Sequence, residues 1–88
     1  MELKYRGQFN RDIDFNNKVI LEEVKLAILH VKKAKLITEI PDLKKLRKYK
    51  TYYRIKVAND YRIGVKIRNN TVWFVCFGHR NLFYKNFP

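Results

Sequence analysis

Five side chains in the second half of this chain have residue types that can act on a phosphodiester. They are Arg54, Lys56, Arg62, Arg80 and Tyr84. Arg54 and Lys56 lie two residues apart in an alternating segment, and side chains at that spacing share one face of a strand. Arg62 begins the next alternating segment on what the pattern indicates is the same face. We expect the five side chains to converge on one shallow patch.

Such a patch could cleave RNA without carboxylates or a metal ion, because RNA carries its own nucleophile, the 2′-hydroxyl. Cleavage requires that this hydroxyl be aligned with the adjacent phosphorus and deprotonated, and that the charge on the phosphorane be stabilised. Like charge from Arg54 and Arg62 favours the neutral form of Lys56, which could then accept the proton. Arg62 and Arg80 can hold the non-bridging oxygens bidentately, and Tyr84 can stack on a base or orient the hydroxyl.

The positive charge of the chain is concentrated in the same half. Residues 43–88 carry twelve Lys and Arg but one acidic residue, Asp60, and the whole chain has a net charge of +12. Exposed cations on a strand face are usually no more than a solvated surface. However, like charges opposite one another on adjacent strands destabilise a sheet. A cluster kept at that cost favours an anionic partner, which we take to be RNA.

Further cations are candidates for gripping the phosphates of a large RNA. They are Lys44, Lys45, Arg47, Lys48, Lys50 and Lys66. The first five fall within seven residues, a run too indiscriminate to specify a site, and a solvated face is the alternative. Gly64, between Arg62 and Lys66, is interpreted as a point where a nucleotide backbone approaches the sheet closely.

Other residues of catalytic type receive an ordinary structural interpretation. His79 is a secondary candidate for an acid or base and ranks below Lys56. Cys76 lies in an apolar strand and is expected to be a small buried hydrophobe. One cysteine and two histidines provide no cluster of metal ligands, so the sequence predicts neither a metal nor a cofactor.

The elements that must position these side chains are predicted to be helical in the first half. Apolar residues recur every three or four positions from Phe15 to about Leu36, which predicts an amphipathic helix. Asp14 or Asn16 can cap its first turn. Three apolar residues fall outside the apolar stripe and need a second element or a partner to cover them: Val19, Leu26 and Leu29.

Shorter elements flank this helix. Leu3–Tyr5 is predicted to be a short strand, and Phe9–Ile13 a short helix that breaks near Asp14. The turn at residues 40–42 is predicted to start another short helix that runs through Leu46.

The second half alternates with the two-residue period of strands. We predict an antiparallel hairpin formed by Thr51–Val57 and Tyr61–Ile67, with one face exposed to solvent. A third strand, Thr71–Phe77, follows the turn at 68–70 and is apolar on both faces, which indicates a central or covered position. Gly78 is expected to end it, and a short tail follows.

Length and composition predict one domain, spanning residues 1–88. The chain is 47% hydrophobic, which is sufficient for a compact core at this size. No run of apolar residues is long enough to span a bilayer, and the first residues lack the apolar stretch of a secretory signal. A single cysteine fits a reducing compartment, so we expect a cytoplasmic protein.

The ordered stretches of the chain resemble the RelE/ParE toxin superfamily, and within it the RelE-like mRNA interferases of bacterial type II toxin–antitoxin modules. The stretches are Leu43-Lys-Lys-Leu46, Tyr53-Arg-Ile-Lys-Val57, Asp60-Tyr-Arg-Ile-Gly64, and Gly78-His-Arg80 followed by Phe83-Tyr84. The resemblance covers nearly the whole chain. It implies a small α+β domain with N-terminal helices packed on one face of an antiparallel three- to four-stranded sheet.

The resemblance also implies an activity and residue roles. Members of this kind cleave mRNA, often in the ribosomal A site, without a metal, and leave a 2′,3′-cyclic phosphate. Lys56 matches their candidate general base, and Arg62 and Arg80 match their phosphate-stabilising arginines, with Arg80 near the leaving group. Tyr84 matches their C-terminal tyrosine, and Arg54 stands where some members have a lysine.

The implied partners are mRNA, the ribosome and a cognate antitoxin. An acidic or amphipathic segment of the antitoxin would cover Val19, Leu26 and Leu29. DNA would be contacted only indirectly, through a complex with the antitoxin, and no contact with a membrane is expected. Two alternatives stay open: a ParE-like inhibitor of DNA gyrase, which shares the fold, and a non-catalytic RNA-binding domain that uses phosphate contacts alone.

Overall fold

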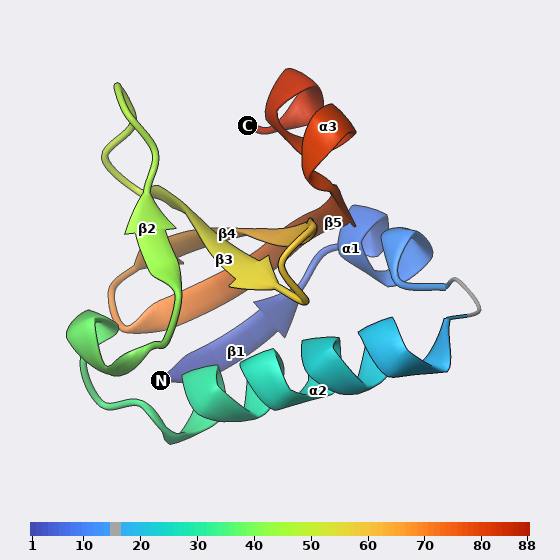
Figure 1. The fold of residues 1–88 in the computed structure, drawn as a ribbon. Helices are drawn as coiled ribbons and strands as arrows, with labels where there is room; N and C mark the ends of the chain where they lie inside the picture. The colour runs from blue at the N-terminus through green and yellow to red at the C-terminus, as the bar shows by residue number, and fades with distance from the viewer. Residues whose placement is uncertain (15–16) are drawn as a thin grey trace.

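Three strands from the second half of the chain form the centre of the computed structural model, which describes residues 1–14 and 17–88. Figure 1 shows a sheet with α2 on one side and α3 on the other. The five strands lie in the order β1-β5-β4-β3-β2. The elements are β1 (Glu2–Tyr5), α1 (Gly7–Asp12), α2 (Lys18–Lys33), the 3-10 turn η1 (Ile37–Glu39), β2 (Leu43–Lys45), β3 (Tyr52–Val57), β4 (Tyr61–Arg68), β5 (Thr71–His79) and α3 (Arg80–Asn86).

The hairpin between β4 and β5 turns where the sequence predicts it. Arg68 pairs with Thr71 across a two-residue turn in which Asn69 and Asn70 have φ of 52° and 62°. Positive φ at both turn positions matches the right-handed twist of the strands, and asparagine adopts this conformation more readily than most residues with a β-carbon. The turn therefore fixes the register that sets which side chains share a face.

β5 is an interior strand, paired on both sides, as its apolar sequence indicates. It pairs antiparallel with β4 on one side and parallel with β1 on the other. The strand continues through Gly78 to His79, beyond its predicted end at Phe77. The sheet is therefore mixed and larger than the antiparallel three- to four-stranded sheet expected from the family resemblance.

The fifth strand forms where the sequence predicts a short helix. That helix, expected from the turn at 40–42 through Leu46, is wrong, because Leu43–Lys45 forms β2 with Leu43 opposite Ile55 of β3. Asp42 has a φ of 61°, outside the right-handed helical region, so the helix is interrupted at its expected first turn.

α2 is the long amphipathic helix expected from the periodicity. The side chain of Asn17 accepts a hydrogen bond of 3.2 Å from a backbone N–H in the first turn. Asn17 therefore supplies the cap, and Asp14 does not. The predicted start at Phe15 and the alternative cap Asn16 lie outside the described residues.

The other end of α2 falls short of the predicted Leu36. The helix ends at Lys33 because the backbone of Ala34 is extended, with φ of −69° and ψ of 138°. Val24 and Val31 form its buried face. Within the described ranges, no helix has the length and hydropathy needed to cross a bilayer.

α1 overlaps the short helix predicted at Phe9–Ile13. Phe9 is fully buried, with its ring centroid 5.3 Å from that of Phe74. The carboxylate of Asp12 accepts a hydrogen bond from the backbone N–H of Phe77 at 3.0 Å. This bond satisfies a donor of β5 beyond the end of its pairing with β1 and holds α1 against the strand.

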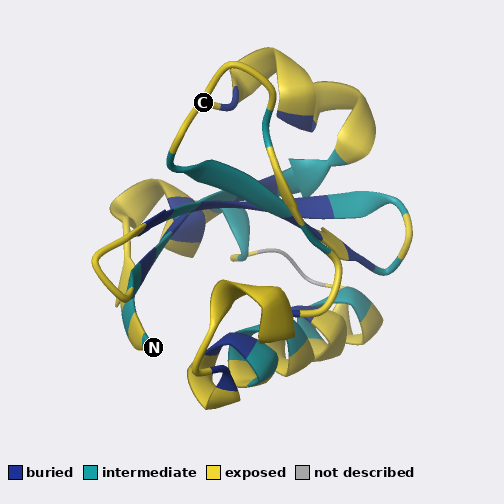
Figure 2. Ribbon diagram, turned by 90° about the vertical axis from the view of Figure 1, so that its left-hand side faces the viewer, coloured by how far each residue is buried: buried dark blue, intermediate teal, exposed yellow. Residues whose placement is uncertain are grey.

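The core lies between the sheet and the N-terminal helices α1 and α2, as expected for the α+β class. Figure 2 shows buried segments in the central strands, while the helices turn exposed sides outward. The strands contribute alternate residues to this layer, which places their intervening residues on the opposite face. The core includes Phe9, Val24, Val31, Ile55, Val57, Ile63, Val65, Ile67, Val72 and Phe74.

The opposite face carries α3, an element that the sequence does not predict. Phe83 and Phe87 are 4% and 6% exposed and pack this segment onto the sheet. A β-carbon at Gly64 would lie 2.8 Å from both the Phe87 ring and the Sγ of Cys76. The interpretation of Gly64 as an approach point for a nucleotide is therefore wrong, because the glycine admits the C-terminal segment instead.

We expect Gly64→Ala to lower the free energy of unfolding by about 1–3 kcal/mol, as over-packing does in other cores, because the methyl group must displace both Phe87 and Cys76. Gly78→Ala is the matched control, since no atom lies within 4 Å of a β-carbon built there. The control should change stability by less than about 0.5 kcal/mol. Urea unfolding followed by circular dichroism measures both variants. Equal stability of Gly64→Ala and wild type would contradict the packing of Phe87 on the sheet.

Candidate functional site

Arg62 is the one buried charged side chain among the described residues, with 9% exposure. It projects from β4 onto the α3 face, directly opposite Lys56 of β3. Its Nη1 donates hydrogen bonds to the carbonyls of Asn59 and Tyr61, at 2.7 and 2.9 Å. Its Nε donates to the hydroxyl of Tyr84 at 3.3 Å. The residues that the structure describes place no carboxylate in an ion pair with this guanidinium.

This arrangement satisfies hydrogen bonds of Arg62 without neutralising its charge. Carbonyl and hydroxyl oxygens accept from the guanidinium but carry no formal negative charge. A buried cation that lacks a counter-ion is unfavourable by itself. Nη2 takes part in none of the three bonds, so it can donate to an anionic group that approaches from outside. The arrangement is therefore suited to an anionic ligand.

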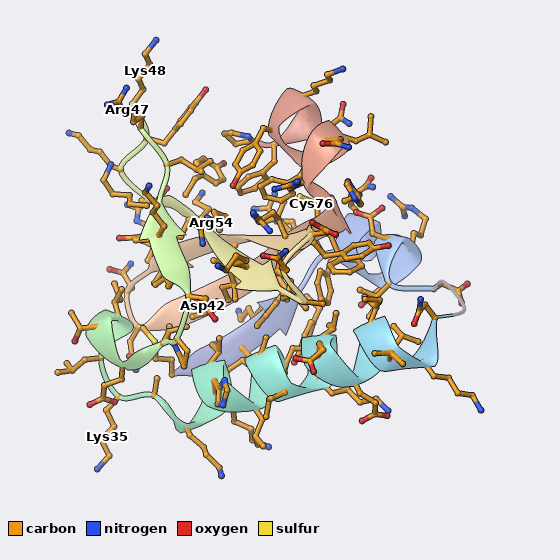
Figure 3. All side chains as sticks on the ribbon, in the orientation of Figure 1. Lys35, Asp42, Arg47, Lys48, Arg54 and Cys76 are labelled. Carbon is orange, nitrogen blue, oxygen red and sulfur yellow. The ribbon has the colours of Figure 1, made fainter. Side chains whose placement is uncertain are left out.

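Lys56 and Arg54 share this face, as the alternation predicts. Lys56 is exposed and forms the cross-strand pair with Arg62. Arg54 lies opposite Gly64, but its Nη1 donates to the carbonyl of Asp42 at 2.7 Å. Figure 3 shows Arg54 and Asp42 near one another beside β2. The guanidinium of Arg54 is thus bound toward the β2 edge, and Lys56 is the closer neighbour of Arg62 on β3.

Tyr84 reaches the cluster from α3. Its hydroxyl accepts the hydrogen bond from Arg62, while the side chain remains 51% exposed. The ring packs edge-on against Phe83, with centroids 5.0 Å apart. Because the oxygen of Tyr84 already accepts from the guanidinium, its own proton can be donated to a ligand. The four-residue spacing from Arg80 to Tyr84 is one helical turn, which brings both to the same end of the sheet.

Arg80 lies at the rim of the cluster and is held by the loop between β3 and β4. Its Nε is 3.6 Å from a carboxylate oxygen of Asp60, and both side chains are about half exposed. Its backbone N–H donates to the carbonyl of Asp60 at 2.8 Å. The same loop supplies the carbonyl of Asn59 to Arg62. Neither Asn59 nor Asp60 is among the predicted site residues, although Asp60 stands out as the one acid of the basic half.

The structure thus brings together three of the five predicted catalytic side chains. Arg62 donates to Tyr84 and stands opposite Lys56 across the strands, with Arg80 at the adjacent rim and Arg54 bound toward β2. The roles assigned to them remain predictions.

The predicted RNA-binding cations do not form one cluster. Arg47 and Lys48 lie at the tip of the loop after β2 and project away from the sheet (Figure 3). Lys45 closes this loop, because its Nζ donates to the carbonyls of Leu46 and Tyr49 at 3.1 and 2.6 Å. The remaining members stand elsewhere: Lys44 opposite Arg54 on β2, Lys50 exposed after the loop, and Lys66 on β4.

The surroundings of His79 and Cys76 indicate structural roles for both side chains. The Nδ1 of His79 accepts a hydrogen bond of 3.2 Å from the backbone N–H of Asn81 and so caps α3. Cys76 is half-buried, and burial first, then the charge of Asp12, raises the pKa of its thiol to about 12. The thiol therefore stays protonated near neutral pH and is a poor nucleophile.

A hollow on the described surface lies apart from the five predicted catalytic side chains. A cavity of about 520 Å³ lies between α1, the end of β5 and α3, and is lined in part by Asp12, Cys76 and Phe83. None of the five predicted catalytic side chains lines it. The described residues also bring together no three His, Cys, Asp or Glu side chains in a possible metal-binding group.

Comparison with known proteins identifies similar chains. No protein-family model matches the sequence. Toxin RelE3 of Methanocaldococcus jannaschii is 32% identical over 89 residues, which cover all of both chains. A chain of the RelB-RelE antitoxin-toxin complex from Methanococcus jannaschii aligns with a TM-score of 0.80 and 29% identity, over 97% of this chain and 99% of that one. YafQ from E. coli strain BL21(DE3) shares the fold, with a TM-score of 0.69 and 20% identity over 91% and 93% of the two chains.

The paired cations predict an unusual response of stability to salt. Lys56→Ala removes the exposed cation opposite Arg62 and should raise the free energy of unfolding by about 0.2–1 kcal/mol at low ionic strength. The gain should shrink in high salt, which screens exposed charges. Urea unfolding at several salt concentrations measures it.

Lys33→Ala is the control, because Lys33 lies in the last turn of α2, where a cation favours the helix dipole. That variant should be slightly less stable than wild type. A loss of stability in Lys56→Ala at low salt would contradict repulsion within the cluster.

Proposed function

The chain belongs to the RelE family of toxins from toxin–antitoxin systems, and on that premise we propose that it is a ribosome-dependent endoribonuclease that cleaves mRNA and so inhibits translation. In this proposal residues 1–88 act as one domain in the cytoplasm, on mRNA in the ribosomal A site. The observation that supports it most is the buried guanidinium of Arg62, which has no carboxylate partner among the described residues and lies beside Lys56 and Tyr84.

The proposed reaction is a transesterification within the RNA. The 2′-oxygen forms a bond to phosphorus while the bond from phosphorus to the 5′-oxygen breaks, leaving a 2′,3′-cyclic phosphate and a 5′-hydroxyl. We assign the removal of the 2′-proton to Lys56, whose exposed amine faces the same surface as Arg62. Arg80 stabilises charge on the departing oxygen, which takes its proton from solvent, because a guanidinium does not release a proton readily.

We assign to Arg62 the stabilisation of the negative charge that develops on the phosphorane. A charge that is buried and fixed before the reaction stabilises a transition state more strongly than one in water. The carbonyls of Asn59 and Tyr61 and the hydroxyl of Tyr84 fix the guanidinium from different sides. Tyr84 is assigned to donate its free proton to the RNA or to stack on a base.

We expect Lys56→Ala, Arg62→Met and Arg80→Ala each to lower the rate of mRNA cleavage by about 10²-fold or more, the usual effect of losing a catalytic base or a transition-state donor. Tyr84→Phe keeps the ring but loses the hydroxyl and should fall between these variants and wild type. The measurement is the rate at which ends with a 2′,3′-cyclic phosphate form on mRNA in translating ribosomes. Lys33→Ala, on the far side of the sheet, should cleave at the wild-type rate.

The same purified proteins separate the proposal from its two alternatives. Intact mRNA with wild-type protein would count against a nuclease. Inhibition of DNA supercoiling by gyrase that survives Lys56→Ala and Arg80→Ala would favour the gyrase inhibitor. RNA binding that weakens steeply with salt, without any cleavage, would favour a domain that only binds.

We also propose that a cognate antitoxin covers the outer side of α2. Val19, Leu26 and Leu29 are 72%, 46% and 42% exposed, so the described elements do not cover them. Their spacing of seven and three residues places them along one side of the helix. A row of apolar side chains on a cationic protein suits an amphipathic, acidic segment that lies along the helix.

A variant with Leu26→Glu and Leu29→Glu should therefore remain toxic in bacteria but lose its protection by the co-expressed cognate antitoxin. The reason is that two carboxylates replace the apolar contacts and repel an acidic segment. Growth with and without antitoxin, together with co-purification, measures the effect. Lys32→Glu, an exposed residue of the same helix outside the stripe, should stay protected. Full protection of the double variant would place the antitoxin on another surface.

A further inference from the structure

A row of alternating aromatic and cationic side chains crosses four strands of the open sheet face, away from the Arg62 cluster. The row consists of Tyr52 on β3, Lys66 on β4, Trp73 on β5 and Lys4 on β1, each directly opposite the next. At the usual separation of neighbouring strands, the row is about 14 Å long. We propose that this row, the cross-sheet platform, binds single-stranded RNA that flanks the scissile phosphate.

The contacts within the platform alternate charge with ring faces. The Nζ of Lys66 lies 5.8 Å from the centroid of the Tyr52 ring. The Nζ of Lys4 and the guanidinium carbon of Arg6 lie 5.1 and 5.5 Å from the Trp73 ring. Each aromatic ring therefore has at least one cation beside its face. Phosphates can pair with these cations while bases stack on the rings or on the guanidinium plane.

The platform lies on the accessible side of the sheet. Tyr52, Lys66 and Trp73 are partly exposed, and Lys4 and Arg6 are exposed. Their neighbours along the strands, such as Val72 and Phe74 on β5, point into the core and are fully buried. A sheet that presents aromatic rings and cations on one face is the surface on which other sheet-based RNA-binding modules stack unpaired bases. No acidic side chain stands in the row.

The platform and the Arg62 cluster belong to one continuous surface. Tyr52 and Lys56 are four residues apart on the same face of β3, about 13 Å along the strand. Arg54 lies between them with Lys44 opposite on β2, so cations line the path. The ring of Phe87 packs edge-on against Tyr52 at 5.5 Å and marks the border between the two areas. A strand of RNA leaving the cluster along β3 therefore meets the platform.

The positive charge of the platform favours RNA as its ligand. Glu2, two residues before Lys4 on β1, borders the platform, while Asp60, the one acidic residue of positions 43–88, already pairs with Arg80. The platform itself carries cations and rings only. The cations of the platform can pair with phosphates and its rings can stack on any base, so the binding should tolerate different sequences. The proposal rests on the proposed function in naming RNA as the occupant, but binding at the platform does not require cleavage.

The single tryptophan of the chain makes the platform directly observable. Trp73 is the only source of tryptophan fluorescence, so a change in its emission reports contact at this place alone. The titrant is a short single-stranded oligodeoxynucleotide, which lacks the 2′-hydroxyl and cannot be cleaved by the proposed reaction. We expect saturable quenching that weakens as salt increases.

Variants assign the quenching to the platform. Lys66→Ala should weaken binding and reduce the slope of log affinity against log salt by about 1. Lys33→Ala removes the same charge from the exposed surface of α2 and should leave both unchanged. Trp73→Ala, followed with a labelled oligonucleotide, should weaken binding by about fivefold or more through lost stacking. Since this variant could also lose stability, Lys66→Ala and the wild-type titration decide without it.

Three results would overturn the platform. The first is unchanged Trp73 emission on binding. The second is an affinity and a salt slope that are the same in Lys66→Ala and wild type. The third is equal quenching by polyglutamate at matched charge, which would make the surface a site for an acidic protein. Quenching without mRNA cleavage would leave the platform in place and remove the nuclease. Cleavage of mRNA without a change in Trp73 emission would support the nuclease and rule out the platform.

Discussion

The burial of the Arg62 guanidinium beneath α3 is the constraint on which the site depends. The loop between β3 and β4 supplies one carbonyl to it, and α3 supplies the Tyr84 hydroxyl. The same loop also binds Arg80 through Asp60. If the guanidinium were displaced, the loop and the helix would lose a common partner. A charge that lacks a carboxylate is therefore also the group that organises its surroundings, and it suits a protein whose ligand brings the negative charge.

Much of the sheet could be predicted because alternation determines which residues share a face. Once Tyr53, Ile55 and Val57 are assigned to the core, Arg54 and Lys56 must lie on the other side. The structure confirms that division, and it confirms the long helix and the interior position of β5. The pairing of Lys56 with Arg62 also follows, since a short hairpin turn leaves little freedom of register.

The elements that could not be predicted depend on contacts between distant parts of the chain. α3 is seven residues long and has no periodic apolar pattern of its own; it forms where Phe87 fits over Gly64. In the sequence alone, a glycine beside two cations fits the close approach of a ligand as well as it fits the packing of Phe87. β2 likewise becomes a strand because β3 offers a free edge, whereas its local sequence resembles the start of a helix. Asp60 belongs to the site only because the hairpin brings it to Arg80.

α3 also separates two areas of the open sheet face that differ in their chemistry. On one side of Phe87, Lys56 stands opposite the buried Arg62, and in the proposed reaction this area stabilises the charge that develops at one phosphate. On the other side, cations lie beside rings at a half-exposed surface and can hold a flexible strand without reading its sequence. The glycine at position 64 makes this possible, since any larger residue would lift the aromatic ring that separates the two areas. In the proposed function, stability and activity would therefore be linked through a single contact, because the packing that holds α3 in place also separates the proposed cleavage site from the proposed RNA-binding platform.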